Sequence, residues 1–133
     1  MKRIVAAFYC NESGREPVRD WLVDMAQDDR KTVGKDIATV EFGWPIGMPT
    51  CRPLREGVYE VRSTIRNGKV EARTYFAIEG SILLLLHGKE GKAGQNEAIE
   101  TAIRRLYDHR RRGRSRKRDD NQSIKNRRRE EGG

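Results

Sequence analysis

Five basic side chains whose types and spacing could do chemistry lie within one stretch, residues 57–92: Arg62, Arg73, His87, Lys89 and Lys92. Guanidinium and ammonium groups bind phosphate oxygens through charge-assisted hydrogen bonds. If the fold gathers these side chains without a matching set of acidic residues, they would suit a phosphate-rich ligand such as a nucleic acid.

The remaining sequence narrows the reactions that these cations could support. It contains no Gly-rich phosphate loop, paired-carboxylate site or nucleophile motif, and metal-assisted hydrolysis lacks its ligands. RNA supplies its own nucleophile, the 2′-hydroxyl, so a cleaving protein must align it, move a proton and stabilise charge on the phosphate. Arginines can stabilise that charge, while His87, or a lysine with a pKa lowered by neighbouring cations, could move the proton. We therefore expect metal-independent endoribonuclease chemistry without a cofactor.

A predicted β-hairpin positions the two central arginines. Asn67-Gly68 lies between two alternating segments, and both central residues of a type I′ turn need positive φ, so this dipeptide predicts a two-residue loop. That loop places Arg62 directly opposite Arg73. Opposed like charges destabilise a strand pair, which is tolerable if their usual partner is a phosphate.

The polar face of this hairpin has a simpler interpretation as well. Glu60 is diagonal to Arg73 and Glu71 is diagonal to Arg62, so the face could be a solvated lattice of surface ion pairs that contributes little. The opposite face is apolar and predicts a core; its residues are Tyr59, Val61, Ile65, Val70, Ala72, Phe76 and Ile78.

The next strand brings the remaining basic residues to the arginines. Residues 81–86 are apolar on both faces, which is typical of a strand covered on both sides. With a short turn at Glu79-Gly80, the end of this strand returns to the level of residues 72 and 73. Further candidates for RNA binding are Arg52, Arg55, Arg66, Lys69 and Tyr75, although solvated charge is the alternative for Arg52 and Arg55.

Helical stripes predict an α+β domain. A first strand is expected at residues 4–9, and no regular element at residues 44–52, which contain two prolines. Apolar residues at i, i+3, i+4, i+7 spacing predict two N-terminal helices and one C-terminal helix. The stripes are Val18, Trp21, Leu22 and Met25, then Val33, Ile37 and Val40 with Asp28 or Asp29 as cap, then Ile99, Ala102, Ile103 and Leu106.

Composition separates a folded domain from a tail. The chain has 133 residues and a net charge of +8. We expect a single domain at residues 1–112 and a basic, disordered tail at residues 113–133, which either binds nucleic acid or only solubilises the protein. Two cysteines give no disulfide framework, and no targeting or membrane segment is visible, so we expect a cytoplasmic protein without membrane contact.

Four segments in order resemble the phage-derived RelE/HigB-like toxins of type II toxin–antitoxin systems, in the RelE/ParE superfamily. They are LREGVYEVR (54–62), EARTYF (71–76), ILLLLHGKEGK (82–92) and EAIETAIRR (97–105). The resemblance covers roughly residues 3 to 110 and implies a RelE-like fold, with helices packed on an antiparallel sheet of about four strands. Arg62, Arg73 and Lys92 match basic positions of the family. Lys89 stands where the family usually has Phe, and Gly91 stands where it has the first Lys of a pair.

The resemblance also implies a function. Such toxins are ribosome-dependent mRNA interferases that cut mRNA in the decoding site, and a cognate antitoxin, commonly a helix-turn-helix protein, neutralises them. Two alternatives stay open: a gyrase-targeting ParE-type toxin without a catalytic site, and a non-enzymatic nucleic-acid-binding phage protein.

Overall fold

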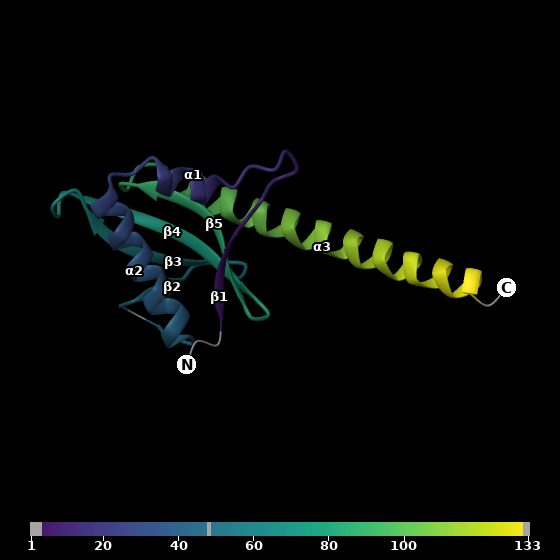
Figure 1. Ribbon diagram of the computed structural model, residues 1–133. Helices are drawn as coiled ribbons and strands as arrows, with labels where there is room; N and C mark the ends of the chain where they lie inside the picture. The colour runs from purple at the N-terminus through teal and green to yellow at the C-terminus, as the bar shows by residue number, and fades with distance from the viewer. Residues whose placement is uncertain (1–3, 48, 132–133) are drawn as a thin grey trace.

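The protein is a three-layer α+β structure built on one sheet (Figure 1). The computed structural model describes residues 4–47 and 49–131, with side chains described as far as Gly113. The sheet has the strand order β1-β5-β4-β3-β2. Its strands are β1 (Val5–Phe8), β2 (Cys51–Pro53), β3 (Tyr59–Ile65), β4 (Val70–Glu79) and β5 (Ile82–Glu90). The predicted α+β class is confirmed.

The edges of the sheet differ from the predicted antiparallel arrangement of about four strands. β1 pairs in parallel with β5, so the sheet is mixed and has five strands. Parallel pairing needs a long crossover, which the two N-terminal helices and the following strands provide. β2 pairs with β3 within the proline-rich segment where no regular element was expected. An edge strand tolerates Pro53, because the missing N–H costs no ladder hydrogen bond there.

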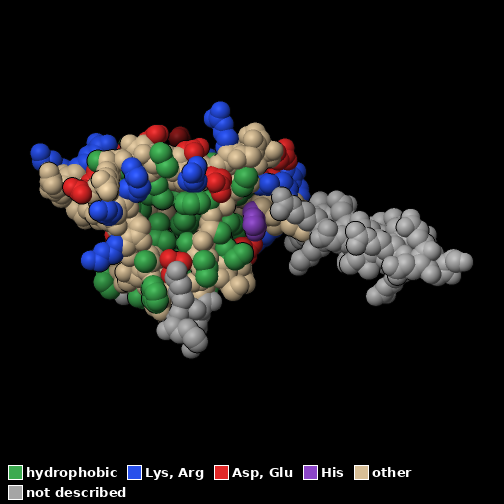
Figure 2. Space-filling model, viewed as in Figure 1, with side chains coloured by type: hydrophobic (Ala, Val, Ile, Leu, Met, Phe, Trp, Pro, Cys, Tyr) green, Lys and Arg blue, Asp and Glu red, His purple; other side chains and the backbone are tan. Residues whose placement is uncertain are grey.

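Three helices cover the two faces of the sheet. They are α1 (Pro17–Val23), α2 (Gln27–Gly43) and α3 (Gln95–Glu131). α1 and α2 lie on one face, and their apolar stripes join the core there. Figure 2 shows this side, where hydrophobic side chains gather at the centre and Lys and Arg side chains lie around them. Asp28 and Asp29 lie in the first turn of α2 and do not cap it, since its N-cap is Ala26.

α3 packs on the opposite face of the sheet, over β5 and β4. Its predicted stripe is confirmed, because Ile99, Ala102 and Leu106 are buried and Ile103 is partly buried in a cluster with residues such as Tyr75 and Leu86. The backbone stays helical to Glu131, where the sequence predicted disorder from about Gly113. Arg, Lys, Gln and Glu are good helix formers, which favours this continuation. No described helix is long and apolar enough to cross a lipid bilayer.

The central hairpin has the predicted turn and register. Asn67 and Gly68 have φ of 55° and 83°, as a type I′ turn requires. Arg62 is the cross-strand partner of Arg73. The apolar face that the sequence predicted lies in the core beneath α1 and α2. The register on which the candidate site depends is therefore confirmed.

Gly88 marks the closest contact between β5 and the helical layer above it. A Cβ atom at this position would lie 2.1 Å from Cε3 of Trp21, because the indole ring rests directly on the strand. Real Cβ atoms do not approach other heavy atoms so closely, so α1 can pack on β5 only if residue 88 is glycine.

We expect Gly88→Ala to destabilise the protein by about 1–3 kcal/mol, the usual cost of overpacking a well-filled core. Urea denaturation followed by circular dichroism measures the free energy of unfolding. The matched control is Gly34→Ala in α2, where the new Cβ has no neighbour within 4 Å. Since alanine favours a helix over glycine, the control should stabilise the protein by about 0.5–1 kcal/mol. Equal stabilities of the two variants would contradict the close contact.

Candidate functional site

A row of three cations crosses the face of the sheet that carries α3. Arg62 on β3 is paired with Arg73 on β4, which is paired with Lys89 on β5. Cross-strand partners project to the same side of a sheet, so the three side chains belong to one surface. α3 covers β5 and β4, and the Arg62 side chain on β3 keeps 42% of its surface exposed. The sheet thus brings together three of the five predicted catalytic residues in one row.

Glu60 separates the two arginines electrostatically. Its Oε1 lies 3.0 Å from Nε of Arg62 and 2.8 Å from Nε of Arg73. The first contact is a hydrogen bond, whereas the second is ionic only, because the Arg73 N–H is not directed at the carboxylate. The hydrogen bond to Glu60 raises the pKa of Arg62. Repulsion between the arginines is therefore offset by a protein carboxylate, and no phosphate is needed to explain their pairing.

Arg73 is an internal residue of this network. It is 2% exposed, its Nη2 lies 3.3 Å from Oε2 of Glu71, and its Nη1 donates to the carbonyl of Gly91 at 2.9 Å. Glu60 is 1% exposed. The simpler interpretation of this face as a solvated lattice is thus wrong at its centre, where the ions are buried. In this conformation Arg73 cannot touch a ligand, but it can position Arg62 through Glu60.

A second row beside the cations carries His87 and Tyr75. The two residues are cross-strand partners, and their rings stack at 6.1 Å with 21° between the planes. Tyr75 is 0% exposed, and burial followed by the Glu60 charge raises the pKa of its hydroxyl. Full burial excludes the predicted role of Tyr75 in contacting RNA, because no part of its ring is accessible. Its ring packs against that of His87.

His87 is held as a neutral imidazole. Nη1 of Arg105 lies 3.1 Å from its Nδ1 and also donates to the carbonyl of Leu86 at 2.8 Å. Burial, followed by the charges of Arg105, Lys89 and Arg104, lowers the pKa of His87 to about 4. An arginine only donates hydrogen bonds, so Nδ1 must be the acceptor and the ring proton must be on Nε2. His87 can donate a hydrogen bond from Nε2, while its lone pair is occupied.

The titration of His87 should report this environment. We expect its NMR titration midpoint at about pH 4, below the ordinary 6.5. The unfolded chain takes up this proton below pH 6.5 and the folded chain does not, so the free energy of unfolding falls as the pH drops from 6.5 towards 4. Arg105→Gln should raise the midpoint, because one of the lowering charges is gone. A midpoint of 6.5 in the wild-type protein would contradict the described geometry.

The other predicted residues lie at different distances from the row. Lys92 is exposed in the loop between β5 and α3, and Arg52 is exposed on β2 opposite Glu60. Arg55 is 54% exposed and lies 3.7 Å from Glu100. Lys69 is exposed at the hairpin end.

Arg66 belongs to the other layer of the protein. Its Nη2 lies 2.8 Å from Oε2 of Glu90, and its backbone N–H donates to Asp29 of α2. Arg66 therefore lies away from the cation row, and its role in RNA binding stays a prediction. Turn residues are hard to assign to one face from alternation alone, because the strand pleat ends before them.

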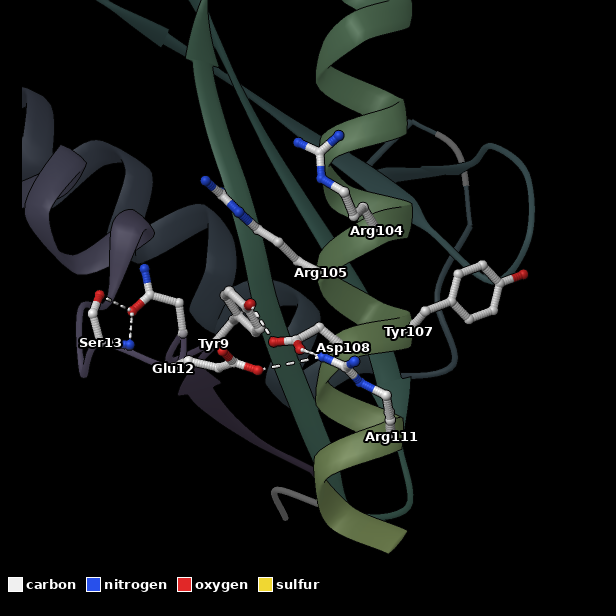
Figure 3. A pocket seen from close by; sticks show the side chains of 9 residues that line it. Tyr9, Glu12, Ser13, Arg104, Arg105, Tyr107, Asp108 and Arg111 are labelled. Carbon is white, nitrogen blue, oxygen red and sulfur yellow. Dashed lines mark hydrogen bonds and ion pairs between the residues drawn. The ribbon is translucent and has the colours of Figure 1, made fainter. Parts of the chain in front are cut away.

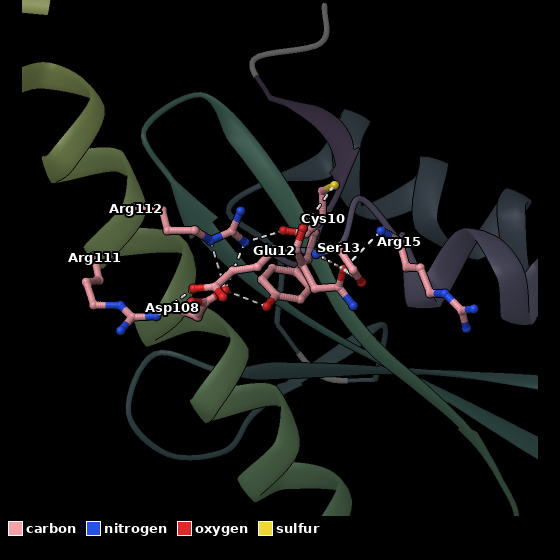
Figure 4. A network of polar contacts seen from close by, with 9 residues as sticks. Cys10, Glu12, Ser13, Arg15, Asp108, Arg111 and Arg112 are labelled. Atoms are coloured by element: carbon pink, nitrogen blue, oxygen red, sulfur yellow. Dashed lines mark hydrogen bonds and ion pairs between the residues drawn. The ribbon is translucent and has the colours of Figure 1, made fainter. Parts of the chain in front are cut away.

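A polar network that was not predicted from the sequence joins α3 to the segment after β1 (Figure 4). The Tyr9 hydroxyl donates to Asp108 at 2.6 Å, and Arg111 and Arg112 lie 2.7 and 2.8 Å from the same carboxylate. Arg112 also donates to the carbonyl of Cys10. The hydrogen bond from Tyr9, followed by that from Arg111, lowers the pKa of Asp108 to about 2. The i, i+3, i+4 spacing of Asp108, Arg111 and Arg112 on α3 was the signal available in the sequence.

Comparison with solved structures identifies the fold of this protein. The fold is that of the RelE toxins: the structure of an arginine double mutant of E. coli toxin RelE in the free state superposes with a TM-score of 0.53. The two sequences are 16% identical, and the match covers 80% of this chain and 99% of the RelE chain. No curated protein matches the chain.

The sequence profile of one family matches residues 20–107. The chain belongs to that family, Phage derived protein Gp49-like (DUF891), which is a family of RelE-like toxins. The resemblance seen in the sequence is thereby confirmed at the level of family and fold.

Proposed function

We propose that this protein is the toxin of a type II toxin–antitoxin system and acts as a ribosome-dependent mRNA endoribonuclease. The observation that carries the proposal is the cross-strand row of Arg62, Arg73 and Lys89, next to a neutral His87. Arg62 and Lys89 are the accessible cations of this row, and Arg73 is the buried one between them. Such preorganised charge on a rigid sheet is what a phosphoryl transition state needs.

The residues divide into those that would touch RNA and those that position them. The exposed edge of the Arg62 guanidinium and the Lys89 ammonium would bind the oxygens of the cleaved phosphate. Glu60 and Arg73 would hold Arg62 from below. His87 would donate a hydrogen bond from Nε2 to a phosphate oxygen.

Proton transfer would then fall to the lysines, because Arg105 occupies the lone pair of His87. A protonated lysine, Lys89 or Lys92, would deliver a proton to the leaving 5′-oxygen while the RNA 2′-hydroxyl attacks phosphorus and releases its own proton to solvent. The P–O2′ bond forms as the P–O5′ bond breaks, so the products would be a 2′,3′-cyclic phosphate and a free 5′-hydroxyl, and uptake of a proton from solvent restores the lysine. The transfer consumes no water molecule and needs no metal ion. As for other toxins of this type, the partner would be an antitoxin, here a helix-turn-helix protein encoded nearby.

One observation favours the alternative of a gyrase-targeting toxin. Two carboxylates and a carbonyl neutralise Arg73 internally, so one predicted catalytic cation is unavailable to a ligand. A toxin that acts by binding alone would tolerate this arrangement.

Inducible expression tests the proposal. We expect growth arrest with mRNA cut inside translated regions. Purified protein should cut mRNA only when the mRNA is engaged on ribosomes. EDTA at a concentration that leaves ribosomes intact should not prevent this cleavage. Growth arrest with a DNA-damage response and intact transcripts would replace the proposal with the gyrase alternative. Normal growth with intact transcripts would exclude both.

A further inference from the structure

A cleft that is separate from the cation row lies between α3 and the loop that follows β1. Its volume is about 810 Å³, within the range of sites that hold a nucleotide-sized ligand. The loop contributes Asn11, Glu12 and Ser13 to the lining, and α3 contributes Arg104, Arg105, Asp108 and Arg111. Figure 3 shows the cleft. The side chains of Arg104 and Arg105 extend towards the N-terminal end of α3, away from Asp108 and Arg111.

Arg104 and Arg105 differ from the arginines that follow them on α3. Arg110 lies 2.7 Å from Glu79, and Arg111 and Arg112 are paired with Asp108. Among the described residues, neither Arg104 nor Arg105 lies within ion-pair distance of a carboxylate. Nη2 of Arg104 donates a hydrogen bond to the Thr101 hydroxyl at 3.5 Å. Two adjacent guanidinium groups without counter-ions form an anion-binding pair.

The opposite wall adds a hydrogen-bond donor. Oδ1 of Asn11 accepts from the backbone N–H of Ser13, the Ser13 hydroxyl and the backbone N–H of Arg15, at 3.0, 2.8 and 2.9 Å. These bonds fix the side chain and leave its amide NH₂ group as the remaining hydrogen-bonding group. Glu12 and Asp108 also line the cleft, but both carboxylates are paired with Arg111. The remaining donors on both walls suit a ligand whose oxygens are all acceptors, which describes a phosphodiester better than a peptide.

Arg105 links the lining of the cleft to the strand that carries the cation row. Nη1 of Arg105 contacts His87, and His87 is one row away from Lys89. The guanidinium also lies over the ring of Tyr9, at 5.9 Å from its centroid, which fixes it on the floor of the cleft. A strand of RNA with one phosphate at Lys89 can therefore continue along α3 into the cleft.

We propose that Arg104 and Arg105 bind the phosphodiester backbone of RNA beside the cleaved position, and that the cleft holds the adjoining nucleotide. This inference rests on the proposed function, since it extends the same RNA path. It assigns to α3 a role in substrate binding in addition to its role in covering the sheet.

Salt-dependent binding of a short, fluorescent 2′-O-methyl RNA tests the inference, because that probe binds without being cleaved. Each phosphate contact to a single strand contributes about 0.7 to the slope of log affinity against log salt. Arg104→Gln/Arg105→Gln should therefore reduce the slope by about 1.4 and weaken binding roughly 10- to 100-fold at low salt. Fluorescence anisotropy of the full-length protein gives both quantities.

The control removes the same charge from the opposite layer. Lys31→Gln/Lys35→Gln changes two exposed lysines of α2, and it should alter the slope far less. Arg104→Gln alone changes an exposed side chain, so it keeps the test valid if loss of the Arg105 bond to Leu86 impairs folding. Arg105→Lys preserves charge and should retain most of the slope.

Several outcomes would overturn the inference. One is that the arginine and lysine variants have equal salt slopes, and another is that wild-type protein does not bind the RNA. A third is that the arginine variants selectively lose binding to poly-glutamate, which would indicate an acidic peptide as the ligand instead. The proposed function can fail separately: if the arginine variants lose RNA affinity while wild-type protein never cuts ribosome-bound mRNA, RNA binding in the cleft stands and the nuclease proposal fails. If mRNA is cut and the arginine variants bind RNA normally, only the inference fails.

Discussion

Replacing Glu60 by glutamine is expected to lower the free energy of unfolding by about 3–5 kcal/mol, the usual cost of breaking a buried ion pair from one side. The amide cannot neutralise Arg73, which is 2% exposed and lies 2.8 Å from the Glu60 carboxylate. Arg62 loses the same partner. Equilibrium urea denaturation measures the loss, and a lower melting temperature should accompany it.

Glu100→Gln provides the matched control for this substitution. Glu100 pairs with Arg55 at 3.7 Å, but both side chains are more than half exposed. Surface pairs of this kind contribute about 0–1 kcal/mol, so the control should change stability little. A second variant, Glu60→Leu/Arg73→Met, removes both buried charges and should recover part of the lost stability. Similar losses for Glu60→Gln and Glu100→Gln would contradict the buried network.

The second large effect is expected on activity. Arg62→Ala and Lys89→Ala should each reduce cleavage of ribosome-bound mRNA by about 10²–10³-fold, the range found when one group that stabilises transition-state charge is removed. Neither substitution removes a large apolar side chain from the core, so the melting temperature should stay close to that of the wild type. Primer extension on mRNA in a purified translation system measures the cleavage rate.

Two controls separate chemistry from charge. Lys35→Ala removes a cation from α2, on the other side of the sheet, and should leave the rate unchanged. Arg62→Lys keeps the charge but loses the forked N–H donors of the planar guanidinium, so it should recover only part of the activity. Full activity in Arg62→Ala would remove Arg62 from the catalytic set, and full activity in Lys89→Ala would do the same for Lys89.

The central hairpin and the helix stripes could be predicted because their signals are local. Asn67-Gly68 admits one tight turn, and that turn fixes the pairing of Arg62 with Arg73. Apolar spacing likewise located all three helices, because a helix must bury one face. Family resemblance added the fold class, which the match to RelE confirms.

The rest of the site depends on contacts that local patterns do not encode. Burial of Glu60 and Arg73 requires the neighbouring strands and the Gly91 carbonyl, which come from distant parts of the sequence. The contact between Arg105 and His87 likewise depends on how α3 crosses β5. Edge strands are equally hard to predict, since β1 and β2 have four and three residues and little alternation.

The division at Gly113 between domain and tail stays a prediction. The backbone of α3 continues through this position without an interruption in secondary structure. The roles of the basic residues beyond it, whether in binding nucleic acid or in solubility, and the expected cytoplasmic location also stay predictions.

Gly91 stands at the end of β5, where the family usually has the first lysine of a pair. Its N–H donates to the carbonyl of Glu71 and its own carbonyl accepts from Arg73, so residues of β4 hydrogen-bond to it on both sides. Its φ of 79° is a conformation that lysine adopts only at a cost of about 1–2 kcal/mol. A lysine at this point would therefore strain the backbone, although its side chain would start in open space, with no atom within 4 Å of its Cβ.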